Sequence, residues 1–291
     1  MRASGVNRAD LLQRMGRYPA PEGAPADVPG LEIAGDVAEV APGMQAWSVG
    51  DRVMGLVGGG GYAEFVAVPA DHLIRIPAGW SFEQAAAAPE AYLTAFDALE
   101  QAGLKAGERV LIHAVGSGVG LALLQLARQA GATVAGTSRT EAKLVRAVRD
   151  VGLEQPVLVR NGVFQPGPEL RDWADVVCDL VGGAYLSGNL VATARQGRII
   201  VIGLTGGRSA TIDLGMLLAK RVSLIGTVLR SRTPEEKARL TRSFAERVLP
   251  AFEKGTLLPV VDRVVPARQA AEAHRHVEAN ENFGAVVLTW D

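Results

Sequence analysis

A glycine-rich turn lies near the middle of the 291-residue chain, within the segment 110–127 (VLIHAVGSGVGLALLQLA). An apolar run of strand length leads into this turn, and a helix-like run follows it. Backbone N–H groups of such a turn can approach a pyrophosphate, which then lies at the positive end of the helix. The spacing departs from G-x-G-x-x-G, because Val115 and Ser117 take the two earlier glycine positions before Gly118 and Gly120. An ordinary tight turn is the alternative, but the strand–turn–helix context favours a dinucleotide site.

The end of the next strand carries groups that suit a phosphate. A site specific for NAD normally has an acidic residue here, which holds the ribose 2′-hydroxyl. In this chain the first acid is Glu141, which we expect to lie already in the following helix. Ser138, Arg139 and Lys143 instead offer a hydroxyl and two positive charges, the donors that a 2′-phosphate requires. A solvated helix start is the alternative, and we expect NADPH rather than NADH as the cofactor.

Residue types that bind metals are scarce in this chain. The single cysteine, Cys178, excludes an internal disulfide and any zinc site built from several cysteines. It lies inside an apolar run, so we interpret it as a buried thiol rather than a nucleophile. None of the four histidines has a spacing typical of ligands: His72, His113, His274 and His276. The sequence therefore predicts no metal ion.

These residues must be positioned by the surrounding elements, and from about residue 91 apolar runs alternate with helix-like segments. The runs with the length of strands are Arg109–Ala114, Thr133–Thr137, Asp175–Leu180, Arg198–Ile202 and Ser223–Val228. Helical spacing or helix-start signals occur at Ala91–Ala102, Leu121–Ala130, Thr140–Val151 and from Pro234 to about Phe252. Strands that are apolar on both faces and alternate with helices indicate an α/β fold with a parallel, doubly wound sheet.

The first ninety residues or so have a different texture, because they are dense in Gly and Pro with short strand-length runs between turns. The last forty or so return to short strands around one helix, and we expect them to rejoin the first part. The sequence therefore predicts a mostly β domain formed by 1–90 and 254–291, and an α/β domain formed by 91–253.

The overall composition is that of an ordinary globular protein, with 48% hydrophobic residues. Lys and Arg number 30 and Asp and Glu 31, which leaves a net charge of -1 and gives no reason to expect nucleic acid or an anionic membrane as a partner. The N-terminus has no apolar core typical of a leader, and no run reaches the ~20 apolar residues that cross a bilayer. With its single thiol, the chain is expected to be a soluble, cytoplasmic protein.

Taken together, these motifs resemble the zinc-independent quinone oxidoreductases of the medium-chain dehydrogenase/reductase superfamily. The segment 107–113, the glycine turn and Gln125 resemble the signature of these enzymes. Further blocks occur in the family's order: Asn7-Arg8-Ala9-Asp10, Gly30-Leu31-Glu32, Gly50-Asp51-Arg52-Val53, Gly61-Tyr62-Ala63-Glu64, Pro89, Leu93-Thr94-Ala95 and Asn282-Phe283-Gly284. The resemblance covers essentially the whole chain. Residues 229–232 and the end of the chain are especially similar to the subgroup of the p53-inducible quinone oxidoreductase homologue.

The resemblance implies a Rossmann-type doubly wound parallel sheet plus a GroES-like, mostly β domain. In the family, a β-hairpin and a further strand precede the block that here begins at Ala3, so the GroES-like domain is expected to lack its first strands. Missing strands are expected to leave unpaired sheet edges. Leu31 stands where the zinc-dependent relatives have a histidine ligand, and leucine cannot bind zinc.

The resemblance also implies which residues carry the chemistry. Asn7 is expected near the nicotinamide and the substrate, and Tyr18 is expected to line the pocket. An amide or a phenol hydroxyl can polarise a carbonyl acceptor, and solvent can provide the final proton. The alternatives are a turn-capping side chain for Asn7 and a rim aromatic for Tyr18. We expect Asp10 to cap a helix at Leu11–Met15.

For the cofactor, the motifs and the resemblance predict contacts from Thr94, Gly118, Val119, Gly120, Ser138, Arg139, Lys143, Gly182, Gly203, Leu229 and Asn282. Gly182 and Gly203 each follow a parallel strand, where such cofactors lie, although plain turn glycines are the alternative. Glu32 is expected to be a buried, paired carboxylate left at the former metal position, and Arg230 a surface charge.

The expected function is therefore metal-independent hydride transfer from NADPH to a quinone or a related α,β-unsaturated carbonyl, in a cleft between the two domains. An alkenal or enoyl reductase of the same fold is one alternative. A non-catalytic NADPH-binding sensor is the other. The resemblance further implies a homodimer, formed through a strand near Ser223–Val228.

Overall fold

The computed structural model describes residues 1–290, which form two compact units. Unit 1 comprises Met1–Leu93 and the residues from Leu229 onwards, and unit 2 comprises Thr94–Val228. The division expected from the sequence kept the helix after Pro234 with the α/β part. In the structure this helix, α8 (Pro234–Arg247), packs against the short helix Ala70–His72 and strand β4 (Leu73–Arg75) of unit 1. The Pro234 carbonyl lies 3.0 Å from His72 Nε2, which accounts for its place in unit 1.

Unit 2 is built on a parallel sheet of six strands in the order β10-β9-β8-β5-β6-β7. The strands are β5 Arg109–Ile112, β6 Thr133–Ser138, β7 Gln155–Leu158, β8 Ala174–Asp179, β9 Thr193–Val201 and β10 Ser223–Gly226. The chain runs outward from β5 to β7 and then returns to β8 on the other side, so the strand order reverses between β5 and β8. Ligands bind at such a reversal in doubly wound sheets. The predicted sheet type is confirmed.

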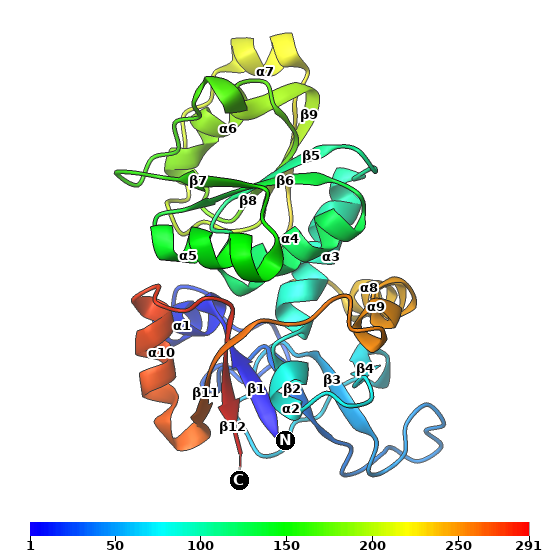
Figure 1. Cartoon of the computed structure of the whole chain (residues 1–291). Coiled ribbons are helices and arrows are strands. Elements are labelled where there is room, and N and C mark those ends of the chain that lie inside the picture. Colours follow the sequence, from blue (N-terminus) through cyan, green and yellow to red (C-terminus); the bar gives the residue numbers. More distant parts are fainter. Residues whose placement is uncertain (291) are drawn as a thin grey trace. The chain divides into compact units, whose positions relative to one another are not determined.

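Helices cover both faces of this sheet, α4 and α5 on one face and α6 and α7 on the other (Figure 1). The helices of this part are α3 Pro89–Ala102, α4 Gly118–Gln129, α5 Glu141–Arg146, α6 Leu186–Ala192 and α7 Leu214–Lys220, with short turns at Ala147–Val151, Pro168–Leu170 and Gly183–Tyr185. Side chains such as Leu111, Val177 and Ile199 point from the strands into a core where they are 0% exposed. Strands buried in this way explain the continuous apolar runs in the sequence.

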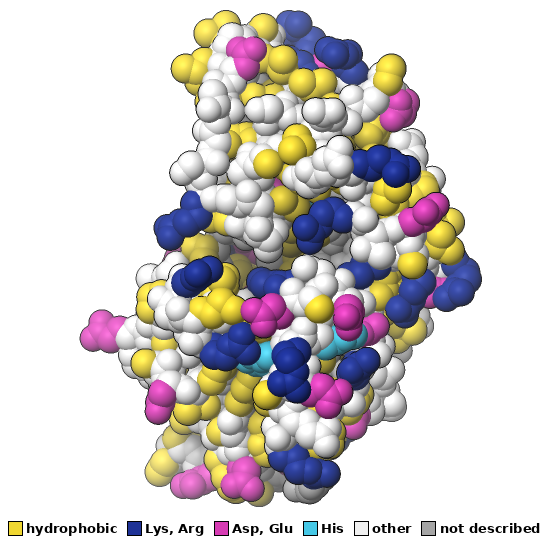
Figure 2. Space-filling view, turned by 90° about the vertical axis from the view of Figure 1, so that its left-hand side faces the viewer, with side chains coloured by type: hydrophobic (Ala, Val, Ile, Leu, Met, Phe, Trp, Pro, Cys, Tyr) yellow, Lys and Arg dark blue, Asp and Glu magenta, His cyan; other side chains and the backbone are white. Residues whose placement is uncertain are grey.

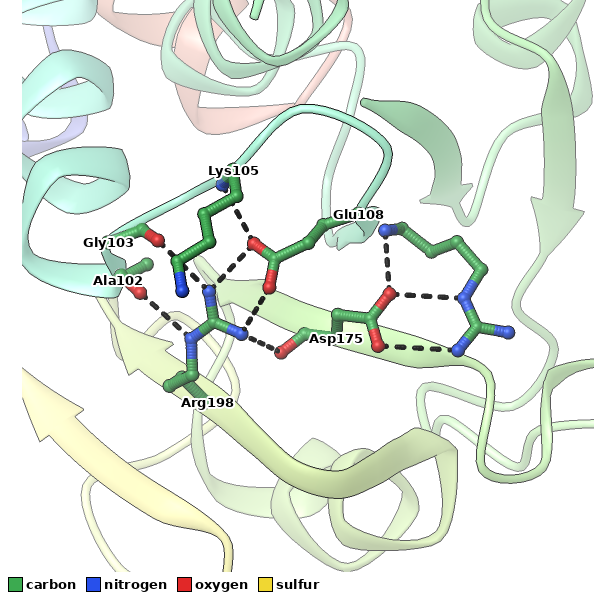
Figure 3. A network of polar contacts seen from close by, with 7 residues as sticks. Ala102, Gly103, Lys105, Glu108, Asp175 and Arg198 are labelled. Atoms are coloured by element: carbon green, nitrogen blue, oxygen red, sulfur yellow. Dashed lines mark hydrogen bonds and ion pairs between the residues drawn. The ribbon is translucent and has the colours of Figure 1, made fainter. Parts of the chain in front are cut away.

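A network of charged side chains joins the amino ends of these strands (Figure 3). Arg198 on β9 donates to both carboxylate oxygens of Glu108, at 2.9 and 2.8 Å, and to the Ala102 carbonyl at 2.8 Å. Asp175 on β8 accepts from the backbone N–H of Arg109 at 2.9 Å and from its guanidinium at 3.1 and 3.3 Å. The network lies at the edge opposite to the carboxyl ends, so we assign it to holding the sheet together.

Unit 1 contains a second sheet of six strands, in the order β11-β12-β1-β2-β3-β4. The strands are β1 Ala3–Val6, β2 Glu32–Asp36, β3 Arg52–Leu56, β4 Leu73–Arg75, β11 Val261–Pro266 and β12 Ala285–Thr289. Strand β1 pairs antiparallel with β12 on one side and with β2 on the other, so it does not lie at a sheet edge. Segments near the beginning and near the end of the sequence therefore form one sheet, as predicted.

The helices of unit 1 correct two expectations. They are α1 Arg8–Arg14, α2 Phe82–Ala86, α8 Pro234–Arg247, α9 Leu249–Glu253 and α10 Ala270–Glu278, with short turns at Ala70–His72 and Ala267–Gln269. The prediction that Asp10 caps a helix at Leu11–Met15 is wrong, because α1 begins earlier and Asn7 is its N-cap. The single helix expected to reach Phe252 is divided at Val248, since Pro250 lacks the N–H that a continuous helix needs.

Basic and acidic side chains are interspersed on the face shown in Figure 2, with apolar side chains between them. This pattern agrees with the balanced composition, since no large area of this face carries one sign of charge. Within residues 1–290, no helix combines the length and the apolar character that crossing a bilayer requires.

Candidate functional site

The glycine turn opens helix α4 directly after β5. Ser117 is the N-cap of this helix, and its Oγ donates to the Ala114 carbonyl at 2.8 Å and accepts the Gly120 N–H at 3.1 Å. The N–H groups of Gly118 and Val119 have no acceptor among residues 1–290. Unpaired amides at the positive end of a helix are the donors that a phosphate requires, so the turn fits the predicted pyrophosphate.

Gly120 allows the helix to pack against the strand as predicted. A Cβ atom at this position would lie 2.5 Å from the Ala114 carbonyl oxygen and 2.8 Å from the Val115 Cα. Neither distance leaves room for a side chain, because both atoms belong to the backbone. The turn is therefore built around this glycine, while Val115 fills the position of an earlier one as a buried side chain.

The loop after β8 is organised by Asp179, a buried residue that the sequence analysis did not single out. Its Oδ1 accepts the N–H groups of Val181 and Gly182, both at 2.8 Å, and its Oδ2 accepts the Asn189 amide at 2.8 Å. Its backbone carbonyl accepts the Gly203 N–H at 3.1 Å. Asp179 thus fixes Gly182 and Gly203, two of the glycines predicted to contact the cofactor, beside the reversal of strand order. An acid at the end of an apolar strand was the signal available in the sequence.

A buried polar chain continues from this aspartate to the end of β6. His113 Nε2 lies 2.6 Å from Asn189 Oδ1, and His113 Nδ1 lies 2.9 Å from Thr137 Oγ1. Because the Asn189 amide nitrogen already donates to Asp179, its oxygen must accept from the imidazole, and the Thr137 hydroxyl donates to the other ring nitrogen. Burial lowers the pKa of His113, which agrees with a neutral ring. These hydrogen bonds join the carboxyl ends of β5, β6 and β8.

A hollow of about 340 Å³ lies after the neighbouring strands β6 and β7, lined by Arg139 and residues 158–162. Ser138 pairs with Leu158 in the sheet, so Arg139 and Arg160 leave the sheet at the same edge. Two guanidinium groups suit a phosphate dianion. Arg160 was missed from the sequence, because the strand that ends two residues before it, β7, was not recognised.

The other residues predicted to hold the 2′-phosphate lie near the same segment but are used differently. The hydroxyl of Ser138 accepts the Thr140 N–H at 3.0 Å, so it shapes the turn after β6. Lys143 is half-buried on α5 and does not line the hollow. Arg139 is exposed and is the predicted residue that does line it.

The remaining predicted cofactor residues are divided between the two units. Thr94 lies on α3 and is 9% exposed, whereas Leu229 and Asn282 belong to unit 1. Leu229 is half-buried, and the Asn282 amide donates to the Gly284 carbonyl at 2.8 Å. The roles of these residues toward a cofactor stay predictions.

In unit 1, Asn7 is held by a buried carboxyl group, that of Glu32. Its Nδ2 donates to Glu32 Oε1 at 2.8 Å, and Glu32 Oε2 accepts the backbone N–H of Glu90 at 2.8 Å. Glu32 is 2% exposed, which confirms that it is buried and paired. A Cβ at Gly5 would lie 1.9 Å from Glu32 Oε1, so the carboxylate has no space to move toward β1. The Asn7 amide is therefore fixed in orientation as well as in place.

A second buried carboxylate, Asp10, ties helix α1 to the glycine-rich segment. It accepts the Gly30 N–H at 2.9 Å, the Asn7 N–H at 2.7 Å and the Tyr62 hydroxyl at 3.3 Å. The same hydroxyl lies 3.1 Å from His274 Nε2 on α10. Asp10 therefore supports the backbone that carries Asn7.

Arg230 is 8% exposed, so the expectation of a surface charge is wrong. Its Nε donates to the Gly58 carbonyl at 3.0 Å, its Nη1 to the Tyr18 carbonyl at 3.1 Å, and its Nη2 to the Gln13 side chain. The guanidinium also lies 4.7 Å from the centroid of the Tyr18 ring. The carbonyls of these irregular segments need donors, which explains why the arginine is drawn inward. Arg230 thereby fixes both the backbone and the ring of Tyr18.

Burial makes three carboxyl groups of unit 1 weak acids. Desolvation raises the pKa of Glu32 to about 8, that of Glu90 to about 7 and that of Asp10 to about 6. Hydrogen bonds from Asn7 and from the Glu90 N–H oppose the shift in Glu32, but desolvation is the larger effect. Burial also raises the pKa of Tyr18. The site therefore holds protons near neutral pH.

The remaining residues of types that can bind metals make contacts that stabilise the fold. No group of three or more His, Cys, Asp or Glu side chains within residues 1–290 has an arrangement that could hold a metal ion. Cys178 is buried, as predicted, and burial raises the pKa of its thiol to about 12, which disfavours the thiolate form. His276 lies 2.8 Å from Asp262, a contact that joins α10 to β11, and 3.1 Å from Glu281, which follows α10.

Comparison with known protein families gives two matches. Residues 118–246 match the zinc-binding dehydrogenase family, and residues 1–78 match the alcohol dehydrogenase GroES-like domain. The quinone oxidoreductase of Mus musculus is 33% identical over 94% of this chain and 83% of its own. The polyketide synthase GfsB of Streptomyces halstedii is 35% identical over 99% of this chain, which spans only 5% of that much longer protein.

Solved structures agree with these matches. A mycobacterial protein complexed with NADPH superimposes with a TM-score of 0.87 and 30% identity, over 99% of this chain and 89% of that one. The CurK enoyl reductase superimposes with a TM-score of 0.85 and 27% identity, again over 99% of this chain and 89% of that one. The fold class predicted from the sequence, a Rossmann-type parallel sheet with a GroES-like domain, is confirmed.

Proposed function

The chain belongs to the medium-chain dehydrogenase/reductase superfamily, and we propose that it reduces a quinone or a related α,β-unsaturated carbonyl with NADPH, without a metal ion. The quinone oxidoreductases among its relatives support this acceptor class. A place in the p53-inducible subgroup is part of the proposal and rests on the residues at 229–232.

For the cofactor, the proposal uses the edge of the sheet in unit 2. The free N–H groups of Gly118 and Val119 would bind the pyrophosphate, and Gly182 and Gly203 would leave room for it in the adjoining loops. Arg139 and Arg160 would bind the 2′-phosphate, which NADH lacks. Smaller contributions are proposed for Gly120, Ser138 and the residues further along the chain: Thr94, Lys143, Leu229 and Asn282. NADPH supplies a hydride from its nicotinamide ring when bound.

The observation that carries the proposal is the donor set of unit 1. Asn7 offers an amide that buried Glu32 holds in place, and Tyr18 offers a phenol hydroxyl beside the guanidinium of Arg230. Leu31 cannot bind zinc, so hydrogen bonds from these groups would take over the polarisation of the acceptor carbonyl. Quinones and enones are already electrophilic, and fixed donors stabilise the negative oxygen that develops on reduction.

An enoyl or alkenal reductase is the second candidate. The likeness to the CurK enoyl reductase and to polyketide synthases supports it, since both extend over nearly the whole of this chain. The same donor set would serve an enone, because hydride addition to its β-carbon also places negative charge on the carbonyl oxygen.

The test is to follow oxidation of NADPH and NADH by the purified chain with 1,4-benzoquinone, 9,10-phenanthrenequinone and a 2-alkenal, with and without a chelator. Turnover of the quinones that prefers NADPH and resists chelation is the expected result. Turnover restricted to the alkenal would replace the quinone assignment with the second candidate. Binding of NADPH by fluorescence without any turnover would instead identify a cofactor-binding protein and overturn both.

A further inference from the structure

Glu90 differs from the other buried carboxyl groups of unit 1. Its backbone N–H donates to Glu32, but its side chain makes no hydrogen bond or ion pair with any of the residues 1–290. Within the same part of the chain, no fully buried side-chain oxygen or nitrogen lacks a partner. The oxygens of Glu90 must therefore keep contact with solvent, although the side chain is half-buried. A carboxyl group in this state does not serve to hold the fold together.

The surroundings of Glu90 come from four segments. Asp10 on α1 and Glu32 on β2 are buried acids, Tyr18 lies after α1, and Arg230 stacks on the Tyr18 ring. Desolvation and the charge of Asp10 raise the pKa of Glu90 to about 7, and Arg230 opposes this. A carboxyl with this pKa is protonated in part at neutral pH and can also release its proton there.

Glu90 also lies close to the proposed polarising group. Its backbone N–H binds one oxygen of Glu32 at 2.8 Å, and the other oxygen of Glu32 binds the Asn7 amide at 2.8 Å. The buried carboxyl group of Glu32 alone thus lies between the Glu90 backbone and the Asn7 side chain. The alternatives for an acid in this region are weaker: both oxygens of Glu32 and of Asp10 are occupied by donors, and burial raises the pKa of Tyr18 further above neutrality.

We propose that Glu90 is the general acid of the reaction, whose carboxyl donates the proton that completes reduction of the acceptor. This inference rests on the proposed function. Hydride addition gives the acceptor two electrons and one hydrogen and leaves a negative oxygen. The O–H bond of the Glu90 carboxyl then breaks, its proton forms the O–H bond of the product, and the carboxylate regains a proton from water.

The first test is the substitution Glu90→Gln, which keeps the size of the side chain and breaks no hydrogen bond of the fold. The readout is kcat/KM for two quinones whose reduced forms differ in basicity. The anion formed from 1,4-benzoquinone is basic and needs an acid, whereas that formed from tetrachloro-1,4-benzoquinone is weakly basic and does not. We expect the variant to lose roughly 100-fold with the first quinone, within the usual contribution of a general acid, and little with the second.

The pH dependence gives a signature that a structural role would not produce. Because the protonated carboxyl is the donor, kcat/KM of the native protein with 1,4-benzoquinone should fall as the pH rises through about 7. This decline should be absent in Glu90→Gln. The matched control is Glu39→Gln, which neutralises an exposed acid of the same unit and should keep both the native rate and the native pH profile.

A binding measurement tests the same group without turnover. The 2,4-dinitrophenolate ion imitates the anion formed by hydride addition. It stays charged from about pH 6 to about pH 9, so a change of its affinity in this range reports on the protein. Neutral Glu90 can donate to this anion and ionised Glu90 repels it, so its dissociation constant should rise with pH in the native protein. In Glu90→Gln the dissociation constant should not change with pH.

The outcomes separate this inference from the proposed function. If the native chain turns over both quinones and Glu90→Gln loses the same factor with each, Glu90 is not the acid, while the quinone assignment stands. Equal activity of the native protein and the variant, with the same pH profile, also overturns the inference. If the native chain turns over neither quinone, the proposed function fails first, and a pH-independent binding of the phenolate would then remove the role of Glu90 as well.

Discussion

At the scale of single residues, preference for the cofactor depends on two arginines at one edge of the sheet. Arg139 and Arg160 line the same hollow, and neither has another function in the proposed chemistry. We expect Arg139→Gln and Arg160→Gln each to weaken NADPH binding by about 10-fold, since a hydrogen bond to a charged group contributes roughly 1.5–3 kcal/mol. NADH binding should change little, because NADH lacks the 2′-phosphate.

Fluorescence titrations with both nucleotides check this prediction. Arg195→Gln is the matched control, since Arg195 is exposed on β9 of the same unit and lies outside the hollow. Equal weakening of NADPH and NADH in the arginine variants would show that the hollow does not select the 2′-phosphate.

The buried acids predict how stability depends on pH. Desolvation raises the pKa of Glu32 from 4.5 to about 8, so the folded chain keeps a proton that the unfolded chain has already released. Stability contributed by this group is complete below pH 4.5 and is lost as the pH rises toward 8. The steepest slope for one such group is about 1.4 kcal/mol per pH unit.

Chemical denaturation at about pH 6, inside the range in which this stability is lost, and at about pH 8.5, above it, measures the effect on the free energy of unfolding. The native protein should be less stable at the higher pH, and Glu32→Gln should show a smaller difference because its amide does not titrate. If the difference in the free energy of unfolding between the two pH values is the same in Glu32→Gln, Glu32 is already ionised in the folded state.

Sequence reasoning at this scale found some residues through their type and missed others whose role depends on the tertiary structure. Glu32 was recognised through the resemblance, because it stands beside the former metal position of the zinc-dependent relatives, where a buried acid must be paired. Arg230 was taken for a surface charge, because three carbonyl or amide acceptors from distant segments meet it only after folding. Arg160 was missed for a related reason, because Arg139, which lines the same hollow, is distant from it in the sequence.

At the scale of elements, strand β8 carries an aspartate near each of its ends, and the two aspartates bind different partners. Asp175 at the amino end binds Arg109, whereas Asp179 at the carboxyl end holds the loop that contains Gly182. We expect Asp179→Asn to weaken NADPH binding and also to lower stability by roughly 1–3 kcal/mol, because the buried Asn189 amide loses its acceptor. Asp175→Asn should lower stability by less and leave the affinity for NADPH unchanged.

The two variants control for each other, because they make the same chemical change on the same strand. The measurements are the dissociation constant of NADPH and the midpoint of urea denaturation. Native affinity in Asp179→Asn would show that the loop after β8 does not contribute to the cofactor site.

Helix α4 depends on the absence of a side chain at Gly120. The substitution Gly120→Ala would place a Cβ 2.5 Å from the Ala114 carbonyl, so helix and strand must move apart. We expect a loss of stability of about 1–3 kcal/mol, as for other overpacked sites, together with weaker binding of NADPH.

Gly215→Ala is the control for this substitution, because Gly215 also lies in a helix, α7, and its Cβ would approach only the Asp213 carboxylate, at 3.2 Å. Its stability should stay the same or rise slightly, since Ala favours helices. Thermal unfolding and NADPH titration distinguish the two, and native stability in Gly120→Ala would contradict the close packing.

Most elements could be predicted from periodicity, and the errors have local physical causes. The buried strands of unit 2 were found because both of their faces are apolar. Strand β7 was not found, because it is short, lies at the sheet edge and contains Pro156, which a central strand would not tolerate. The break between α8 and α9 was missed because the capping signals at Thr233 are strong and conceal the effect of Pro250.

At the scale of the whole molecule, the sequence correctly indicated that segments near both ends form one sheet. Strands β11 and β12 join β1 in that sheet. The boundary after unit 2 was placed at 253 because the α8 segment reads as another helix of an alternating pattern. Its contacts with β4 decide where it belongs, and such contacts leave no periodic signal in the sequence.

Strand β10 forms one edge of the sheet of unit 2, and from the exposure of this edge we predict that two copies of the chain associate there. Nothing within residues 1–290 pairs with the outer side of β10, and its Leu224 is 45% exposed. Helix α7, which precedes β10, exposes Leu214 and Leu218 to 66% and 77%. An uncovered strand edge flanked by exposed leucines is costly in water, so pairing with a second copy would stabilise it.

We therefore expect the chain to be a dimer, and Leu218→Lys combined with Leu224→Lys to make it a monomer that still binds NADPH. Size-exclusion chromatography with light scattering measures the mass of both proteins. Val145→Lys is the control, because it places the same charge at an apolar residue of α5 that is 58% exposed and lies on another element. A native monomer, or a double variant that remains dimeric, would show that this edge is protected in some other way.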